Sequence, residues 1–166
     1  MADIMDLSKL AFIKLPSKKL GSGSDILLNS IKQVEKRSFP SNEAFDFNTE
    51  LPKRTTNLYC AFAKTGNEPE LCGYIVYVRS KLVTRIHKVC VVEKKRGQGI
   101  GRWMMDLVLV DLKKGGAGIV DLWVDKNREI ARKLYEACGF EKRETVENYY
   151  SGGRDAVRME INLCDC

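Results

Sequence analysis

The sequence contains no apolar run long enough to cross a bilayer, which takes about 20 consecutive apolar residues. Its first residues, MADIMDLSKLAFIKLP, lack a basic region followed by a long apolar stretch, so they predict no secretory signal. None of the six cysteines falls in a paired CxxC pattern, which argues against a zinc module. We therefore expect a cytoplasmic or nuclear protein with reduced cysteines, no membrane partner and no bound metal.

Signatures of nucleic-acid binding are also missing. The formal net charge is +6, but the basic residues are spread along the chain and no RNA-binding or helix-turn-helix motif accompanies them. A ligand that carries several phosphates would use the same excess of positive charge. We predict no nucleic-acid partner. The terminal Cys164-Asp165-Cys166 is not a CaaX prenylation box, and we interpret it as a disordered tail.

What the sequence does contain is the material for one globular domain over residues 1–166, with 44% hydrophobic and 30% charged residues. A strand is expected at residues 9–15. A helix follows, with Ser24 as its N-cap and an apolar stripe at spacings i, i+4 and i+7. That stripe consists of Leu27, Ile31 and Val34. Pro40 ends this helix, and a short second helix is expected at 43–51.

The rest of the chain alternates between strands and helices. The apolar patterns predict strands at 56–64, 71–80, 84–92, 118–124, 140–150 and 156–163, with the TGNEPE sequence as a turn between the first two. They predict helices after the glycines at 97–101 and at 127–138. The stripe of the first of these helices consists of Ile100, Trp103, Met104, Leu107 and Val110. The resulting order, β-α-α-β-β-β-α-β-α-β-β, predicts an α/β (α+β) fold with a mixed sheet and helices on its faces.

The most informative stretch is the glycine-rich turn between the strand at 84–92 and the next helix. Three glycines stand there within five residues, flanked by Arg96 and Arg102. The N-terminus of a helix presents unpaired N–H groups and a partial positive charge, and glycine lets a ligand approach the backbone closely. Arg102 replaces a glycine that both the P-loop and the dinucleotide fingerprint need, so the turn matches neither. It predicts a site for another phosphorylated ligand.

Two motifs give this turn a family resemblance. Residues 96–101, RGQGIG, resemble the Arg/Gln-x-x-Gly-x-Gly/Ala motif of the GNAT superfamily of acetyl-CoA-dependent N-acetyltransferases, and residues 131–140, ARKLYEACGF, are similar to its Ala-x-x-x-Tyr-x-x-x-Gly-Phe signature. The resemblance implies that the loop binds the pyrophosphate of acetyl-CoA. It also implies that the main chain of the preceding strand serves the pantetheine arm and the oxyanion. The residues that it implies as contacts of acetyl-CoA are Val89, Cys90, Val91, Arg96, Gly97, Gln98, Gly99, Ile100, Gly101 and Arg102.

The chain departs from this family at the start of the second motif. Family members usually carry asparagine three residues before the motif alanine, Ala131, whereas this position holds Arg128 here and Asn127 lies one residue earlier. Both are kept as candidate contacts of the cofactor. Arg128 reaches a phosphate in one interpretation and is a solvated helix residue in the other.

Acetyl transfer needs a deprotonated amine and a leaving thiolate that is held or protonated. The resemblance implies that Tyr135 donates a proton to the leaving thiolate. The alternative is that Tyr135 is a tyrosine that only packs in the core. His87 is the only histidine, and it stands nine residues before Arg96, as in arylalkylamine acetyltransferases. An ordinary histidine pKa of about 6.5 suits a general base. Trp123 stands where several protein N-terminal acetyltransferases carry Glu or His, so the base is either His87 or a bound water.

Two segments are expected to form walls around the acceptor amine. The segment SFPSNEAFDF forms one wall in the resembled family and contributes Phe39, Pro40 and Glu43. The last hairpin forms the other, where ENYYSGGRDAVRM, with Tyr149 and Tyr150, resembles a pattern of protein N-terminal α-amine acetyltransferases. The predicted acceptor is the α-amine, or a lysine, of a peptide or protein. A polyamine or arylalkylamine acetyltransferase and a non-catalytic acyl-CoA-binding module are the alternatives. A monomer or weak dimer is expected.

Overall fold

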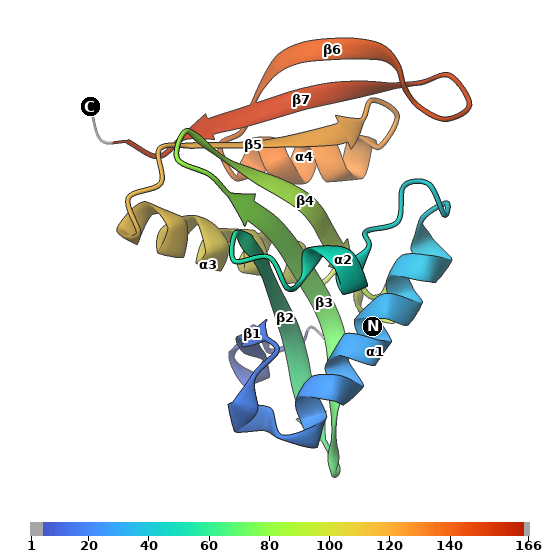
Figure 1. The fold of residues 1–166 in the computed structure, drawn as a ribbon, viewed down its shortest axis with the longest axis vertical. Helices are drawn as coiled ribbons and strands as arrows, with labels where there is room; N and C mark the ends of the chain where they lie inside the picture. Colours follow the sequence, from blue (N-terminus) through green and yellow to red (C-terminus); the bar gives the residue numbers. More distant parts are fainter. Residues whose placement is uncertain (1–4, 165–166) are drawn as a thin grey trace. The chain divides into compact units, whose positions relative to one another are not determined.

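The computed structural model describes residues 5–164, so the last two residues of the Cys-Asp-Cys terminus lie outside the description. Among the described residues, seven strands form one mixed sheet in the order β1-β2-β3-β4-β5-β7-β6 (Figure 1). The strands are β1 (Ala11–Leu15), β2 (Thr56–Thr65), β3 (Glu68–Arg79), β4 (Val83–Val91), β5 (Ile119–Asp125), β6 (Glu141–Tyr150) and β7 (Arg154–Asn162). The helices are α1 (Ser22–Ser38), α2 (Phe47–Glu50), α3 (Ile100–Lys114) and α4 (Glu129–Ala137). The predicted fold class and order of elements are confirmed.

The chain packs as two compact units. The first consists of the residues up to Val76 and of Lys88–Met104, and the second of Tyr77–His87 and the residues from Met105 onward. Strands β3 and β4 and helix α3 each run from one unit into the other. The recorded pairs are antiparallel for β1 with β2, β5 with β7 and β6 with β7, and parallel for β4 with β5.

In the first unit, α1 lies along β2 and β3 (Figure 1). Leu27 and Ile31 are fully buried, and Val34 packs against the same cluster, so the predicted stripe is confirmed. The prediction of Ser24 as N-cap is wrong. The helix begins at Ser22, after Gly21 in the left-handed region with a φ of 54°, and the hydroxyl of Ser24 instead accepts a hydrogen bond from the Ser17 amide at 2.9 Å.

The segment after α1 is mostly a turn rather than a helix. The carbonyl of Pro40 accepts hydrogen bonds from the amides of Glu43 and Ala44, both at 2.9 Å. Helix α2 begins only after Asp46, whose carboxylate caps it by accepting from the amides of Asn48 and Thr49. The side-chain and main-chain hydrogen bonds from Thr49 lower the pKa of Asp46 below its ordinary value. The predicted helix at 43–51 is therefore shortened to four residues.

Two further predictions need correction. The TGNEPE turn is limited to Gly66 and Asn67, because β3 already begins at Glu68. In α3 the predicted stripe is right at Ile100 and Met104, which are buried, but Leu107 and Val110 are 40% and 54% exposed. The residues that α3 buries further along are Met105, Val108, Leu109 and Leu112. Apolar residues occupy more than one face of this helix, so periodicity alone does not fix its rotation.

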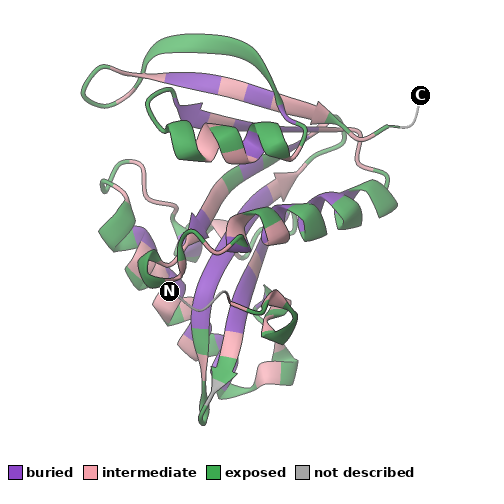
Figure 2. Ribbon diagram, turned by 180° about the vertical axis from the view of Figure 1, so that it is seen from behind, coloured by how far each residue is buried: buried purple, intermediate pink, exposed green. Residues whose placement is uncertain are grey.

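The second unit has a buried face and an open face. Figure 2 shows β6 as exposed along nearly all of its length, whereas β7 alternates and buries Ala156, Val157 and Met159. Helix α4 buries Tyr135, whose ring meets that of Phe140 edge to face. None of the described helices is long and apolar enough to span a membrane. The described cysteines form no disulfide with one another, and burial raises the pKa of Cys60 to about 12.

Candidate active site

The glycine turn lies in the first unit, between a short 3-10 turn (Glu93–Lys95) and α3. Gly97 and Gly99 have φ angles of 77° and 84°, in the left-handed region that glycine adopts without strain. Gly101 lies in the first turn of α3, and the carbonyl of Gly99 accepts from the Trp103 amide at 3.0 Å. The first turn of this helix contains no acidic residue. The turn therefore offers backbone N–H groups and the positive end of a helix to an anionic ligand.

The strand before the turn is tied to it by Arg96, whose Nε donates to the carbonyl of Val91 at 3.1 Å. Cys90 is buried in β4, while Val89 and Val91 are half-buried. The recorded parallel ladder joins Val83–Ile86 of β4 to Ile119–Leu122 of β5, and β4 continues five residues past it, to Val91. The main chain of 89–91 thus follows the part of β4 that pairs with β5.

The predicted acceptor wall of the first unit is held by Lys88, a residue that the sequence did not single out as functional. The Lys88 ammonium lies 3.5 Å from the centroid of the Phe39 ring and donates to the Glu43 carbonyl at 2.8 Å. It also pairs with Glu35 Oε1 at 3.2 Å. Phe39 and Glu43, two of the three residues predicted for this wall, are therefore brought together around one cation.

Glu35 is a buried carboxylate with three partners. Besides Lys88, its oxygens accept hydrogen bonds from the Tyr74 hydroxyl and, at 3.1 Å, from the Phe45 amide. Burial raises the pKa of Tyr74, so this hydroxyl stays protonated and remains a donor. A buried charge without partners is costly, whereas this one has an opposite charge and two hydrogen bonds. The carboxylate thereby fixes the end of α1 to β3, β4 and the segment at 39–45.

In the second unit, His87 lies on β4 with its side chain exposed. Burial alternates along this strand, with Thr84 and Ile86 buried and Arg85 and His87 exposed, as the period of a strand predicts. The Arg85 guanidinium makes two hydrogen bonds of 2.9 Å to the buried carboxylate of Asp121 on β5. Hydrogen bonding to Asp121 raises the pKa of Arg85, so the open face beside His87 keeps a fixed positive charge.

Tyr135 lies on α4 and is 7% exposed. Its ring centroid is 6.1 Å from that of Phe140. Its carbonyl accepts hydrogen bonds from the amides of Cys138 and Phe140, which lie on either side of Gly139 and end the helix. Gly139 has a φ of 102°, and a Cβ there would stand 3.0 Å from Ile161. The Tyr-x-x-x-Gly-Phe spacing is thus explained by a helix stop that packs Phe140 against Tyr135.

The start of α4 contains the two residues at which the chain departs from the motif. The Asn127 amide donates to Asp125 Oδ1 at 2.9 Å, and Arg128 is the exposed N-cap residue of α4 without a side-chain capping bond. The other carboxylate oxygen of Asp125 pairs with Arg154 at 2.9 Å. Asp125 therefore links the start of α4 to the start of β7.

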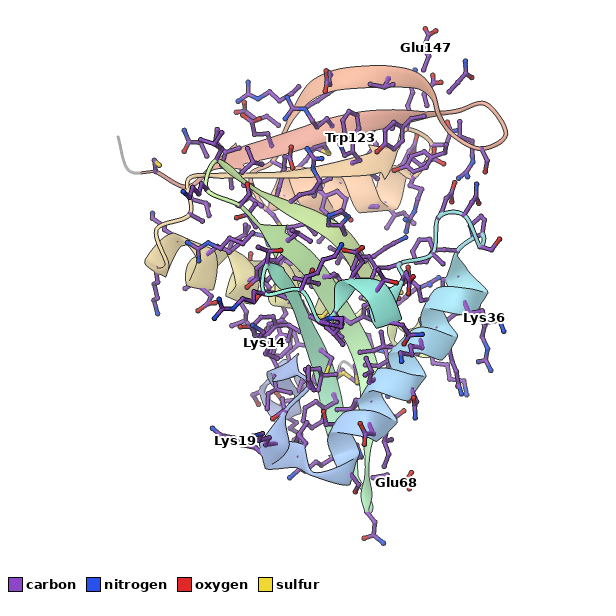
Figure 3. The ribbon with its side chains drawn as sticks, in the orientation of Figure 1. Lys14, Lys19, Lys36, Glu68, Trp123 and Glu147 are labelled. Carbon is purple, nitrogen blue, oxygen red and sulfur yellow. The ribbon has the colours of Figure 1, made fainter. Side chains whose placement is uncertain are left out.

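An aromatic cluster lies where the second wall is predicted. The Trp123 ring on β5 (Figure 3) stacks on that of Tyr149, with centroids 4.9 Å apart and an interplanar angle of 11°. Tyr149 meets Tyr150 edge to face at 5.0 Å, and Arg154 lies 5.3 Å from the Tyr150 ring centroid. Tyr149 is 49% exposed, so this cluster is open to solvent. The structure thus brings Tyr149 and Tyr150 together, with Trp123 as a third member.

Residues 28–140 match the acetyltransferase (GNAT) family. The chain belongs to this family. The matched segment includes the glycine turn, His87 and Tyr135, and it ends before the tyrosine pair of the last hairpin. The predicted family, the enzyme class of acetyl-CoA-dependent N-acetyltransferases and acetyl-CoA as the acetyl donor are confirmed at the level of the family.

Two relatives are similar over about half of the chain. One is an uncharacterised N-acetyltransferase of Methanocaldococcus jannaschii, 33% identical over 78 residues, which are 47% of this chain and 34% of that protein. The other is N-alpha-acetyltransferase 30 of Schizosaccharomyces pombe, 31% identical over 88 residues, which are 53% of this chain and 59% of that protein. The chain therefore spans less than two thirds of the length of either relative.

The fold is also that of solved acetyltransferases. The ribosomal-protein-S18-alanine N-acetyltransferase from Escherichia coli superimposes with a TM-score of 0.75 at 20% identity, over 95% of this chain and 96% of that chain. At this level of identity the likeness establishes the arrangement of the seven strands and their helices. It agrees with the mixed sheet predicted from the order of elements.

The glycine turn leads to a first prediction. Replacing Gly99 by alanine should lower the affinity for acetyl-CoA roughly tenfold, because a side chain in the left-handed region costs about 1–2 kcal/mol and the loop must shift to relieve it. A Cβ at Gly99 would meet only a Leu7 methyl at 3.9 Å, so the fold tolerates it. Gly66→Ala, in a hairpin turn of the same unit with a φ of 73°, imposes similar strain elsewhere and is the control. Equal affinities of the two variants in calorimetry would contradict a role for the turn.

Proposed function

We propose that residues 1–166 act as one catalytic domain that transfers the acetyl group of acetyl-CoA to the α-amine of a peptide or protein. The observation that carries this acceptor class is the cluster of Trp123 on β5 with Tyr149 and Tyr150 at the end of β6. Tyrosines present a flat apolar ring together with a hydroxyl that hydrogen-bonds main chain, which suits an extended peptide. The partial similarity to N-alpha-acetyltransferase 30 supports the same class.

In the proposed reaction the lone pair of the amine attacks the thioester carbonyl. A C–N bond forms, the carbonyl oxygen becomes an oxyanion, and the C–S bond breaks as this intermediate collapses. The proton lost by the amine passes to His87 or to a water, and the coenzyme A thiolate takes a proton from Tyr135. Main-chain N–H groups of Val89, Cys90 and Val91 stabilise the oxyanion, because such preorganised donors act without reorganising.

The acetyl donor is held by the remaining predicted residues. The backbone of residues 96–101 binds its pyrophosphate, with Arg96 and Arg102 adding positive charge. Asn127 and Arg128 are assigned to the same ligand at the start of α4. The exposure of Arg128 and the absence of a side-chain capping bond suit a residue that reaches for a phosphate. The tyrosine pair and the segment that contains Phe39, Pro40 and Glu43 are each assigned to binding of the acceptor.

The acceptor class is tested by replacing Tyr150 with alanine. We expect KM for a peptide acceptor to rise roughly tenfold, since a lost contact of about 1.4 kcal/mol corresponds to a factor of ten. The affinity for acetyl-CoA and the slow hydrolysis of the thioester should stay unchanged. Tyr150→Phe separates the hydroxyl from the ring. Glu147→Ala is the matched control, because Glu147 lies exposed on the same strand and points away from the sheet (Figure 3).

The measurement is release of free thiol from acetyl-CoA with panels of peptides and of small amines. An enzyme that acetylates polyamines or arylalkylamines, ignores every peptide and tolerates Tyr150→Ala would overturn the peptide acceptor and leave the acetyltransferase class standing. Binding of acetyl-CoA without turnover on any amine would instead support a non-catalytic acyl-CoA-binding module.

A further inference from the structure

Lys88 and Glu35 form a charged pair within the first unit, and the proposed mechanism assigns it no role. The Lys88 side chain is 14% exposed and that of Glu35 is 2% exposed. Each member also contacts the segment at 39–45, Lys88 through the Phe39 ring and the Glu43 carbonyl, and Glu35 through the Phe45 amide. One buried carboxylate and one half-buried ammonium are thus joined to three points of one irregular segment.

This segment has few other means of keeping its shape. Between the end of α1 at Ser38 and the start of α2 at Phe47 it contains no helix or strand, and Pro40, Ser41 and Asn42 are exposed. Apart from its two hydrogen bonds to the Pro40 carbonyl, the segment depends on contacts from its surroundings to keep one conformation. A main-chain carbonyl bonded to an ammonium and an aromatic ring under the same ammonium are two such contacts, and both are stronger in partly buried surroundings.

We infer that Lys88 is a positioning residue that holds the acceptor wall, residues 39–45, in the conformation that receives the acceptor, and that Glu35 fixes Lys88 in turn. This inference rests on the proposed function, because residues 39–45 are taken as one wall of the acceptor site. Lys88 directly follows His87 on β4. One strand therefore contains both the proposed base and the residue that sets the wall.

Substitutions of Lys88 and of Glu35 remove different contacts of the segment. Lys88→Met keeps an unbranched chain of similar length but removes the ammonium, so the Glu43 carbonyl and the Phe39 ring lose their partner. Lys88→Arg keeps a cation at this position. Glu35→Gln removes the negative charge and keeps only one acceptor oxygen, whereas the Tyr74 hydroxyl and the Phe45 amide donate to different oxygens of Glu35. Lys36→Met is the matched control for the loss of a lysine. Lys36 is exposed on α1, the helix that contains Glu35, and points away from the strands (Figure 3).

Two measurements test the inference independently. Hydrogen exchange of the amides of residues 41–45 should quicken roughly tenfold or more in Lys88→Met, and remain as in the natural protein in Lys36→Met. KM for the acceptor should rise roughly tenfold in Lys88→Met, with kcat changed less than twofold and the affinity for acetyl-CoA unchanged. Lys88→Arg should restore most of both properties, and Glu35→Gln should give an intermediate effect.

Each alternative outcome is informative. A folded Lys88→Met variant with unchanged exchange at 41–45 would overturn the inference, whatever the acceptor proves to be. Quickened exchange with unchanged KM for every acceptor would also overturn it, because the segment would then be no part of the acceptor site. Turnover on small amines alone, with KM raised for them in Lys88→Met, would remove the peptide acceptor and support the positioning role.

Discussion

Replacing Tyr135 by phenylalanine should lower kcat by about 10²–10⁴-fold, the usual contribution of a positioned acid or base. The substitution removes one oxygen and keeps the ring, which is buried in α4 and packs edge to face on Phe140. The affinity for acetyl-CoA should therefore stay nearly intact. The physical reason for the loss is that a thiolate expelled into a dry site returns to the carbonyl unless it is protonated.

Tyr77→Phe is the control for this experiment. Tyr77 is 4% exposed on β3 within the same unit, and it has no role in the proposed mechanism. Both variants lose a buried hydroxyl, so both should lose a comparable amount of stability in thermal unfolding. Only the variant at Tyr135 should lose turnover. A folded Tyr135→Phe enzyme with full kcat would remove Tyr135 from the chemistry and leave it as a core residue.

The order of strands and helices could be predicted because most elements have an apolar pattern and are separated by proline or glycine stops. The end of α1 followed from Pro40, and Gly115 and Gly116 marked the end of α3. The predictions were wrong where two neighbouring residues could both serve the same structural role. Ser24 is a good capping residue, but Gly21 begins the helix earlier and the Ser24 hydroxyl serves Ser17 instead.

The predicted acceptor wall depends on contacts between residues that are distant in the sequence, and local patterns do not reveal these. Glu35 stands four residues after Ile31, as Ile31 does after Leu27, and therefore lies on the apolar stripe of α1. This spacing is the sequence feature that indicates its burial. A buried carboxylate needs a cation, but no sequence spacing identifies which one. Lys88, on a distant strand, is identified only by the folded arrangement. Similarly, periodicity placed Trp123 in a strand, whereas its stacking on Tyr149 depends on how β5, β7 and β6 pair.

Replacing His87 by glutamine is expected to lower kcat by about 10²–10⁴-fold if His87 is the base. Glutamine keeps a polar side chain on the exposed face of β4, so the strand and its buried neighbours Ile86 and Cys90 should be undisturbed. Lys81→Gln, in the exposed turn between β3 and β4, is the control for a lost positive charge near this strand. The affinity for acetyl-CoA should be the same in both variants.

The pH dependence distinguishes His87 from a water relay. A base must be unprotonated to act, so the activity of the natural enzyme should fall toward acid pH as His87 takes up a proton, whereas the activity of His87→Gln should follow deprotonation of the acceptor amine instead. As the pH rises toward the pKa of the acceptor, more of the amine is already deprotonated and the deficit of the variant should shrink. The deficit should be smaller for an α-amine, with an ordinary pKa of about 8, than for a lysine of about 10.4. A variant that keeps both its kcat and the acidic limb would assign proton removal to water, with the tyrosine pair and Lys88 retaining their proposed roles in binding the acceptor.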